Sequence, residues 1–386
     1  MNDKKKIMVI DDSAVFRSWL INSIRSDDRF EVVGYAINAF DAKQKIPVLK
    51  PDILTLDIEM PGMSGIEFLK EYLPGHPIPV ILVSSLNIRV FDALAAGAVD
   101  FVRKPDTENG QSKAAFITTL LSRLVIASNA KVYFPPAAAT GGPTAAYGKS
   151  QIVSQSISQP LPNSSRLFSH GGSGFPSISG SIPGASSGAM SGQTLSVGND
   201  SLIAIGASTG GTEAILEVLT HLPARIPGIV ITQHMPSGFT SMYADRLNRL
   251  CKFEVKEAQS GDKIRPGLAL IAPGGSQMKV VRMGSGYAVN CYPGEKFNGH
   301  RPSVDVLFDS VAAVARDKAI GVLLTGMGAD GAAGLLRMRR NGAFTIGQDK
   351  DSCVVYGMPM EAYKIGAVCR QVPLANIAQT ILSRLS

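Results

Sequence analysis

The chain has 386 residues, a formal net charge of +7 and four cysteines, and these features exclude several classes of protein. The length predicts two or three domains with ample hydrophobic cores. No apolar run is long enough to span a bilayer, and the N-terminal residues lack the hydrophobic region of a signal peptide. The cysteines are widely spaced, with no Cys-x-x-Cys pair, which argues against a disulfide framework or a zinc site. We therefore expect a monomeric, cytoplasmic protein without membrane insertion.

The first 105 residues alternate between strand and helix patterns. Strands are expected at residues 7–10, 30–34, 53–56, 80–83 and 99–102. Ser13 can cap the first helix. This alternation predicts a doubly wound, flavodoxin-like domain with a five-stranded parallel sheet.

Polar residues follow the predicted strands at the points where these strands end. They are Asp11, Asp12, Asp57, Ser84 and Lys104. Three carboxylates at one sheet edge repel one another unless a divalent cation lies among them, and the hard oxygen ligands suit Mg²⁺. We expect Asp57 to accept a phosphoryl group, with Asp12 and the Glu59 carbonyl helping to hold the metal. Lys104 would pair with the phosphoryl charge, and Ser84 would contact one of its oxygens.

Between the two predicted globular regions the composition changes. Residues 126–199 are rich in glycine, serine, proline and alanine, and residues 141–190 contain no acidic residue. Such a segment buries too little apolar surface to offset the entropy of ordering it. The sequence therefore predicts three parts: a phosphoacceptor domain at residues 1–125, a flexible linker at 126–199 and a second globular domain at 200–386.

The second domain begins with a strand pattern that breaks into small residues around Ser208. The spacing Gly206-x-Ser208-x-Gly210 is that of a nucleophile elbow, a sharp strand-to-helix turn that exposes a hydroxyl above a sheet edge. Alone, this motif is weak, because similar glycine-rich turns bind phosphate or simply pack. A catalytic interpretation needs a base and a carboxylate to orient that base.

Candidates for both partners follow other predicted strands. His234 comes directly after the apolar run at residues 226–233, whereas His221 reads as a surface residue and His300 lies in a polar loop. Asp330 lies in a glycine-rich turn after the strand at 319–325. Parallel strands end at one edge of a sheet, so these groups should meet. The order Ser, His, Asp differs from that of the α/β-hydrolases, which indicates another doubly wound, mostly parallel α/β scaffold.

These motifs resemble two known families over nearly the whole of both domains. DDS at 11–13, LDIEMPG at 56–62, SS at 84–85 and FVRKP at 101–105 resemble a two-component receiver domain. GASTGG at 206–211, QHMP at 233–236, RPSVDVLF at 301–308, LTGMGADG at 324–331 and VVYGMP at 354–359 resemble the CheB family of chemotaxis protein-glutamate methylesterases. Ser64 departs from the aspartate that is common in this receiver segment, and the linker is unusually long. Compared with the family, Pro47 is expected to interrupt the second receiver helix, and the stretch between Ser85 and Gly97 is a few residues short, which predicts a shortened fourth helix.

The resemblance implies a receptor-modifying hydrolase of the chemotaxis system. Such an enzyme demethylates methylglutamate side chains of chemoreceptors, releases methanol and often deamidates receptor glutamines, with no cofactor for the ester chemistry. Ser208 would be the nucleophile, His234 the base and Asp330 the orienting acid. A chemotaxis histidine kinase would phosphorylate Asp57 in the presence of Mg²⁺ and so relieve inhibition by the receiver.

Residues around the predicted triad have expected roles as well. The backbone N–H groups near Thr209 and Gly210 are the expected oxyanion donors. Met327 would line the site, and Arg301 could steer an acidic receptor helix toward it.

Two alternatives remain open at this level. The same chemistry could act on a receptor of a non-chemotaxis signalling array, because the catalytic residues would be identical. A transcriptional response regulator is the alternative from another class, since receivers often precede DNA-binding modules. The second domain shows no helix-turn-helix pattern, and its positive charge is modest and dispersed, so we expect no nucleic-acid partner.

Overall fold

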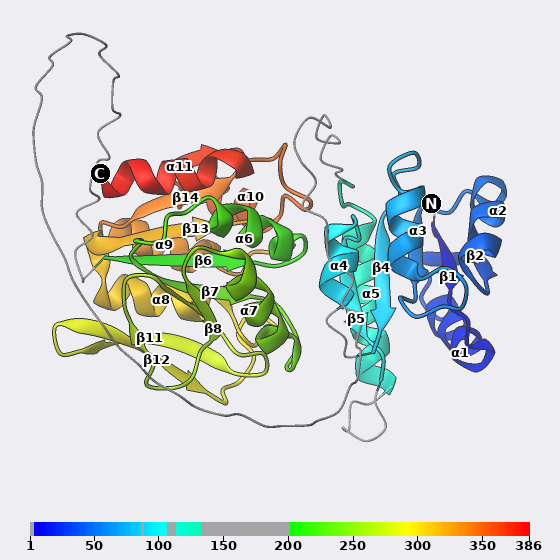
Figure 1. Ribbon diagram of the computed structural model, residues 1–386, viewed down its shortest axis with the longest axis horizontal. Coiled ribbons are helices and arrows are strands. Elements are labelled where there is room, and N and C mark those ends of the chain that lie inside the picture. The colour runs from blue at the N-terminus through cyan, green and yellow to red at the C-terminus, as the bar shows by residue number, and fades with distance from the viewer. Residues whose placement is uncertain (1–3, 86–88, 106–112, 133–200) are drawn as a thin grey trace, which may run out of the picture. The chain divides into compact units, whose positions relative to one another are not determined.

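A computed structural model describes residues 4–85, 89–105, 113–132 and 201–386 (Figure 1). Most of the predicted linker at 126–199 lies outside these residues, and the predicted domain boundaries at 125 and 200 stay predictions. Within the described part of the chain, no helix is long and apolar enough to cross a membrane.

The N-terminal domain is built on a five-stranded sheet in the order β2-β1-β3-β4-β5, with every pair of neighbours parallel. The strands are β1 (Lys5–Ile10), β2 (Phe30–Ala36), β3 (Ile53–Leu56), β4 (Val80–Ser84) and β5 (Asp100–Arg103). The helices are α1 (Ala14–Arg25), α2 (Ala39–Leu49), α3 (Gly65–Tyr72), α4 (Arg89–Ala95) and α5 (Lys113–Ala127). The predicted flavodoxin-like architecture is therefore confirmed.

Alternation along β1 shows why helices cover both faces of this sheet. Ile7 and Val9 pack in one apolar cluster with residues of α1 and α5. Met8 and Ile10 point the other way and pack in a second cluster with residues of α2, α3 and α4. Consecutive strand residues face opposite sides, so a strand that is apolar throughout must be buried on both faces.

Two local departures of this domain have clear physical accounts. Ser64 is the N-cap of α3 and forms a capping box with Glu67, so the serine supplies the helix start. The expectation that Pro47 interrupts the second helix is wrong: Pro47 lies inside α2, which continues to Leu49. Pro47 lies in the last turn of α2, so its missing N–H group affects only the end of the helix. The helix ends soon afterwards at Lys50, whose φ is +46°.

The C-terminal domain is built on a seven-stranded sheet in the order β15-β14-β13-β6-β7-β10-β8. The strands are β6 (Leu202–Ala207), β7 (Gly228–Gln233), β8 (Glu254–Glu257), β10 (Leu268–Ile271), β13 (Ala319–Leu323), β14 (Phe344–Gln348) and β15 (Arg370–Val372). All of its neighbouring strands run parallel. The chain enters at β6 in the middle, builds one side of the sheet and then returns to build the other.

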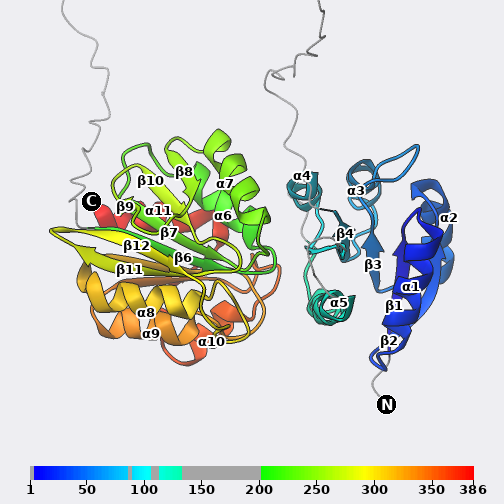
Figure 2. The same ribbon diagram turned by 90° about the horizontal axis from the view of Figure 1, so that it is seen from below.

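Helices cover both faces of this sheet, as Figure 2 shows. One face carries α6 (Gly211–Thr220), α7 (Phe239–Leu250) and α11 (Leu374–Leu385), and the other carries α8 (Val304–Val314), α9 (Ala332–Arg340) and α10 (Met358–Lys364). A 3₁₀ turn at Arg316–Lys318 leads from α8 into β13. The doubly wound α/β prediction is therefore confirmed.

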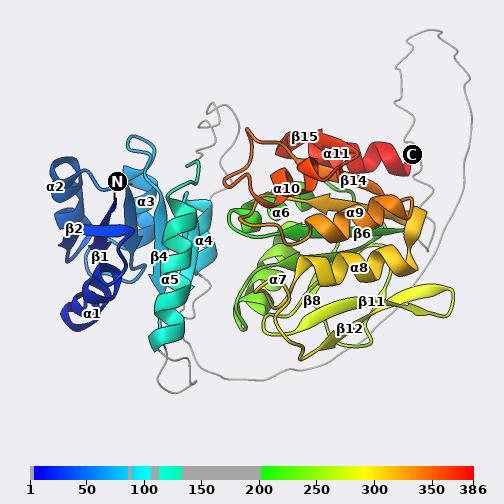
Figure 3. The same cartoon turned by 180° about the vertical axis from the view of Figure 1, so that it is seen from behind.

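A small antiparallel sheet lies beside α8 (Figure 3). It consists of β9 (Lys263–Ile264), β11 (Gln277–Met283) and β12 (Gly286–Tyr292), with β11 and β12 forming a hairpin. The segment from 293 to 303 connects this hairpin to α8 at the carboxyl edge of the large sheet.

The strand order places a topological switch point between β6 and β13. From β6 the chain proceeds to β7 on one side, whereas β13 lies directly on its other side. Loops diverge at such a point and leave a crevice at the carboxyl ends of the strands, where α/β proteins bind their ligands. The residues that follow β6, β7 and β13 are those predicted to form the catalytic site.

Candidate catalytic and phosphoacceptor sites

Ser208 lies directly after β6, between the ends of two neighbouring strands. Its backbone N–H donates to the Thr325 carbonyl over 3.0 Å, and its carbonyl accepts from the Gln233 side chain over 2.8 Å. The residue is buried. Gly210 follows with φ of +75° and begins α6, which is the sharp turn that the elbow spacing predicts.

His234 occupies the matching position after β7. Ala207 and Gln233 are partners in the parallel register, so Ser208 and His234 are the next residues on two adjacent strands. His234 Nε2 lies 2.8 Å from Asp330 Oδ2, and both side chains are almost fully buried. Its Nδ1 atom is buried and has no hydrogen-bond partner among the residues that the structure describes. With the proton on Nε2, Nδ1 therefore offers a free lone pair for a hydroxyl proton.

Asp330 is surrounded by hydrogen-bond donors at the N-terminus of α8. Besides His234, its carboxylate accepts from the Val304 and Asp305 backbone N–H groups, the Ser303 hydroxyl and the Asn298 side chain. Burial alone would raise the pKa of Asp330, but the hydrogen bond from His234 and the other donors hold that pKa well below its usual range. The carboxylate therefore stays ionised and can stabilise a protonated imidazole.

The loop at residues 294–303 supplies groups that the sequence analysis did not assign. The ring of His300 stacks on the ring of His234, with centroids 3.6 Å apart and planes 9° apart. Asn298 donates to both Asp330 and Asp305, and Ser303 caps α8 while it binds Asp330. Only Ser303 gave a usable signal, since a serine before an apolar helical run is a typical N-cap.

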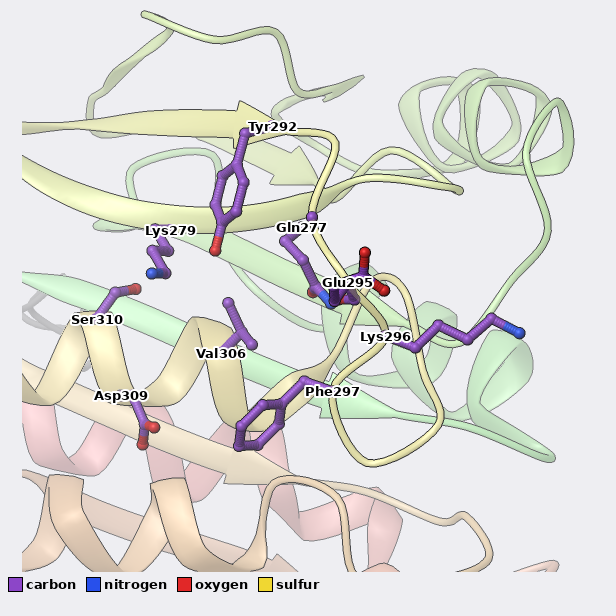
Figure 4. Close-up of a pocket in the computed structure, with 10 residues that line it drawn as sticks. Gln277, Lys279, Tyr292, Glu295, Lys296, Phe297, Val306, Asp309 and Ser310 are labelled. Atoms are coloured by element: carbon purple, nitrogen blue, oxygen red, sulfur yellow. The ribbon is translucent and has the colours of Figure 1, made fainter.

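Gln277 on β11 supports the loop at residues 294–303, which it adjoins at Glu295 (Figure 4). Its side-chain amide donates to the carbonyls of Glu295 and His300, and its oxygen accepts from the Ser303 N–H group. Gln277 also lines a cavity of about 450 Å³ between the β11–β12 hairpin and α8. The small sheet therefore positions the residues that surround Asp330.

The other predicted active-site residues fall in three different settings. Within the described residues, no hydrogen bond from the backbone N–H groups of Thr209 or Gly210 is found, so both remain free to bind an oxyanion. Met327 lies in the loop before Asp330 and is 38% exposed. Arg301 is exposed and donates to the Gly294 carbonyl, a contact that supports the loop. Its steering role stays a prediction.

The N-terminal domain brings its predicted polar residues together at the carboxyl ends of β1, β3, β4 and β5. Lys104 Nζ lies 2.5 Å from Asp57 Oδ2 and 3.0 Å from Asp11 Oδ2. Burial raises the pKa of Asp57. For Lys104, burial would lower the pKa, but the hydrogen bond and charge of Asp57 outweigh it and raise that pKa.

This pocket has the donor set of a divalent-cation site. Carboxylate oxygens of Asp11, Asp12 and Asp57 all lie within 4.8 Å of one another. The Glu59 N–H group donates to Asp57 over 3.2 Å, which places residue 59 beside the same carboxylate. Within the described part of the chain, the buried Ser84 hydroxyl finds no hydrogen-bond partner. The residues present therefore fit a magnesium ion with its hard oxygen ligands, and they offer a free hydroxyl to a phosphoryl oxygen.

A cluster of hydrogen bonds joins the two domains next to Ser208. The Thr209 hydroxyl donates to Asp100 Oδ2 over 2.7 Å, and Arg123 Nη1 donates to the same oxygen over 2.6 Å. Arg123 also lies 3.1 Å from the Thr209 hydroxyl oxygen. Asp100 begins β5, the strand that ends just before Lys104. We call Asp100, Arg123 and Thr209 the interdomain latch.

Comparison with known proteins agrees with this division. Residues 203–381 match the CheB methylesterase family and residues 7–114 match the response regulator receiver domain. The chain is 46% identical over 376 residues to a protein-glutamate methylesterase/protein-glutamine glutaminase of Syntrophomonas wolfei, covering 97% of this chain and 96% of that protein. A protein of the same name from Syntrophotalea carbinolica is 43% identical over 390 residues, covering 100% and 99% of the two chains.

A solved structure of the Thermotoga maritima CheB methylesterase catalytic domain is 34% identical to this chain. It covers 49% of this chain and 100% of that domain, with a TM-score of 0.47. The match of residues 203–381 to a methylesterase leaves the transcriptional-regulator alternative without support. From the two domain matches and the full-length identities, the chain belongs to the CheB family, whose members are named protein-glutamate methylesterase/protein-glutamine glutaminase.

Proposed function

We propose that this enzyme hydrolyses methyl esters of glutamate side chains on chemotaxis receptors and deamidates receptor glutamines. The observation that carries the proposal is the buried His234–Asp330 pair, with Nδ1 of His234 unpartnered one strand away from Ser208. The names of the relatives support the substrate class. Receptors of a non-chemotaxis array would meet the same residues, and only the assay of defined receptors separates the two.

These residues support a two-step acyl transfer. Ser208 Oγ attacks the ester carbonyl while His234 Nδ1 takes the hydroxyl proton, and the N–H groups of Thr209 and Gly210 bind the developing oxyanion. Collapse of this intermediate breaks the C–O bond, and His234 returns the proton to the leaving group as methanol. Water then attacks the acyl-enzyme with His234 again as base, which frees the glutamate and restores Ser208. With an amide substrate the leaving group is ammonia.

His234 uses its two nitrogens in the reverse of the usual serine-protease assignment. In the familiar triad, Nδ1 faces the carboxylate and Nε2 faces the serine. Here Nε2 faces Asp330. The reversal preserves the chemistry, because either nitrogen of a neutral imidazole accepts a proton while the other donates to the carboxylate.

The receiver pocket supports regulation by a histidine kinase. Asp57 would accept the phosphoryl group, with Asp11, Asp12, Asp57 and the Glu59 carbonyl available to Mg²⁺. When bound, the metal would neutralise charge on the phosphoryl oxygens. Lys104 and the Ser84 hydroxyl would then bind phosphoryl oxygens, which withdraws Lys104 from its present contact with Asp57. Lys104 directly follows β5, whose four residues begin at Asp100, so a change at Lys104 would act on Asp100 through this strand.

The interdomain latch supports inhibition in the unphosphorylated state. It fixes Thr209, the residue after the nucleophile, through a carboxylate and a guanidinium of the receiver. A receptor helix that approaches Ser208 must displace these groups. Opening the latch by phosphorylation of Asp57 would then uncover the site.

Methanol release from methylated receptor membranes, with and without a small phosphodonor and Mg²⁺, tests both the proposed triad and the proposed regulation. Ser208→Ala should abolish methanol release with and without the phosphodonor while the chain stays folded. Asp57→Asn should keep the basal rate and lose the stimulation. Full activity in the Ser208 variant would exclude the proposed triad, and stimulation in the Asp57 variant would exclude the proposed phosphorylation site.

A further inference from the structure

The catalytic imidazole makes a ring contact that the triad chemistry does not explain. The rings of His234 and His300 are nearly parallel, at 3.6 Å between centroids and 9° between planes. Asp330 fixes His234 at Nε2 only. A single hydrogen bond at one edge leaves the tilt of a ring free, whereas a stacked neighbour fixes its plane. Together, the two contacts determine where Nδ1 points.

The His300 ring is placed by its backbone. Its N–H group donates to the Phe297 carbonyl over 2.9 Å, and its carbonyl accepts from the Phe297 N–H group and from Gln277. Among the described residues, neither nitrogen of the His300 ring has a hydrogen-bond partner. The loop therefore presents a ring face to His234, with no polar bond of its own to account for the position.

The charge state of His300 suits such a contact. Burial, followed by the charge of His234, lowers the pKa of His300 to about 4, so the ring is neutral at physiological pH. The titratable groups that face it are His234 after β7, Asp330 after β13, Arg123 on α5 and Lys296 on its own loop. Two protonated rings at this distance would repel each other, whereas a neutral ring face attracts a cation.

We propose that His300 is a positioning residue for the reaction, whose neutral ring orients His234 and stabilises the imidazolium that forms when Ser208 loses its proton. This inference rests on the proposed triad and adds a residue to it. The stabilisation acts after the proton has moved, so it lowers the barrier of the chemical step and leaves substrate binding unchanged.

If His300 only filled space, any apolar side chain of similar volume could replace it. A pair of substitutions therefore separates this role from stacking on His234. His300→Phe keeps an aromatic face against His234, and His300→Leu keeps the site dry but removes that face. His221→Phe is the matched control, because His221 is an exposed histidine at the end of α6.

The experiment measures methanol release by the full chain over pH 5–9, with phosphodonor present so that the latch is open. We expect His300→Phe to stay within about threefold of the wild type. In His300→Leu, kcat should fall about tenfold with KM within twofold, and the acid limb of kcat/KM should move about half to one pH unit lower. The lower position follows because an imidazolium that loses its stacking partner gives up its proton more readily.

Titration of the His234 ring by NMR, in histidine-labelled Phe and Leu variants, gives the same comparison without turnover. If the Leu variant does not fold, His300→Met replaces it as the apolar partner. Equal pH profiles and equal titration of His234 in the Phe and apolar variants would overturn the proposal. Activity in Ser208→Ala would instead overturn the triad on which it rests.

Discussion

The hydroxyl of Thr209, which adjoins the nucleophile in sequence, donates to the Asp100 carboxylate of the receiver over 2.7 Å. Arg123 binds the same carboxylate oxygen, so one buried acid links a receiver helix to the catalytic turn. The contact gives the receiver a hold on the backbone expected to bind the oxyanion. The proposed inhibition would therefore involve the geometry of this turn as well as its coverage.

Asp100→Ala should raise the activity of the unphosphorylated enzyme about tenfold and reduce its stimulation by a phosphodonor. Hydrogen bonds to a charged group contribute about 1.5–3 kcal/mol each. Loss of the latch should therefore shift the equilibrium between the closed and open states by about tenfold or more. The measurement is methanol release with and without phosphodonor. Asp28→Ala is the control, since Asp28 is exposed and pairs with the exposed Lys4. An unchanged basal rate in Asp100→Ala would contradict the latch.

Asp330 should contribute stability that depends on pH in a defined direction. Its folded-state pKa lies well below the usual value, so its contribution is complete above the unfolded pKa of about 3.9 and is lost as the pH falls further. Asp330→Asn should therefore lower the unfolding temperature by a constant amount above about pH 5, with a shrinking difference below pH 4. Calorimetry of both proteins between pH 3.5 and 7 measures this.

Asp309, which is partly exposed and pairs with Arg337 in the same domain, provides the control for this titration. Asp309→Asn should change the unfolding temperature little at any pH, because exposed ion pairs contribute little. A difference between Asp330→Asn and the wild type that grows toward low pH would have the wrong sign for a depressed pKa.

Ser84→Ala should separate phosphorylation from stability in the receiver. The buried Ser84 hydroxyl has no partner in residues 4–85, 89–105, 113–132 or 201–386, so its removal breaks no hydrogen bond there. The free energy of unfolding should therefore change by less than about 0.5 kcal/mol. Phosphorylation by a small phosphodonor should slow if this hydroxyl binds a phosphoryl oxygen. Thr55→Val is a close control, because the Thr55 hydroxyl is also buried and unpartnered but lies within β3. Equal phosphorylation rates in the two variants would remove Ser84 from the pocket.

Gly326→Ala should impair catalysis through steric pressure on the nucleophile. A Cβ atom at Gly326 would lie 2.7 Å from Ser208 Cβ and 2.3 Å from the Met358 sulfur. We expect a loss of about 1–3 kcal/mol in stability and at least a tenfold loss of methanol release. Gly286→Ala is the control, since a Cβ atom there meets nothing within 4 Å. Full activity in Gly326→Ala would contradict this prediction, because Ser208 would then tolerate displacement.

The sequence was sufficient to predict that several candidate site residues directly follow strands. Ser208 and His234 each come after a buried apolar run, and Asp330 lies in the turn after another. Parallel strands must end at a common edge, so position along the chain translates into position in space. Asp57 and Lys104 were predictable for the same reason. In a parallel sheet, polar residues that directly follow strands are thus strong evidence that these residues lie close together.

Residues placed by loops and by the second domain could not be found in this way. His300 and Asn298 reach the triad only because Gln277 and the N-terminus of α8 fix the loop between them. No hydrophobic period marks such a loop, and the polar pattern around His300 resembles that of a solvated one. Asp100 reads as an ordinary strand residue, because its partner Thr209 is 109 residues away.

The order of the segments has a consequence for biosynthesis. The triad draws on residues 208, 234 and 330, whereas the described receiver ends at residue 132. Domains generally fold as they leave the ribosome, the N-terminal one first. A nascent chain therefore has its regulator in place well before Asp330 is synthesised. Under the inhibition proposed here, no stage of translation yields a complete catalytic domain that still lacks its receiver.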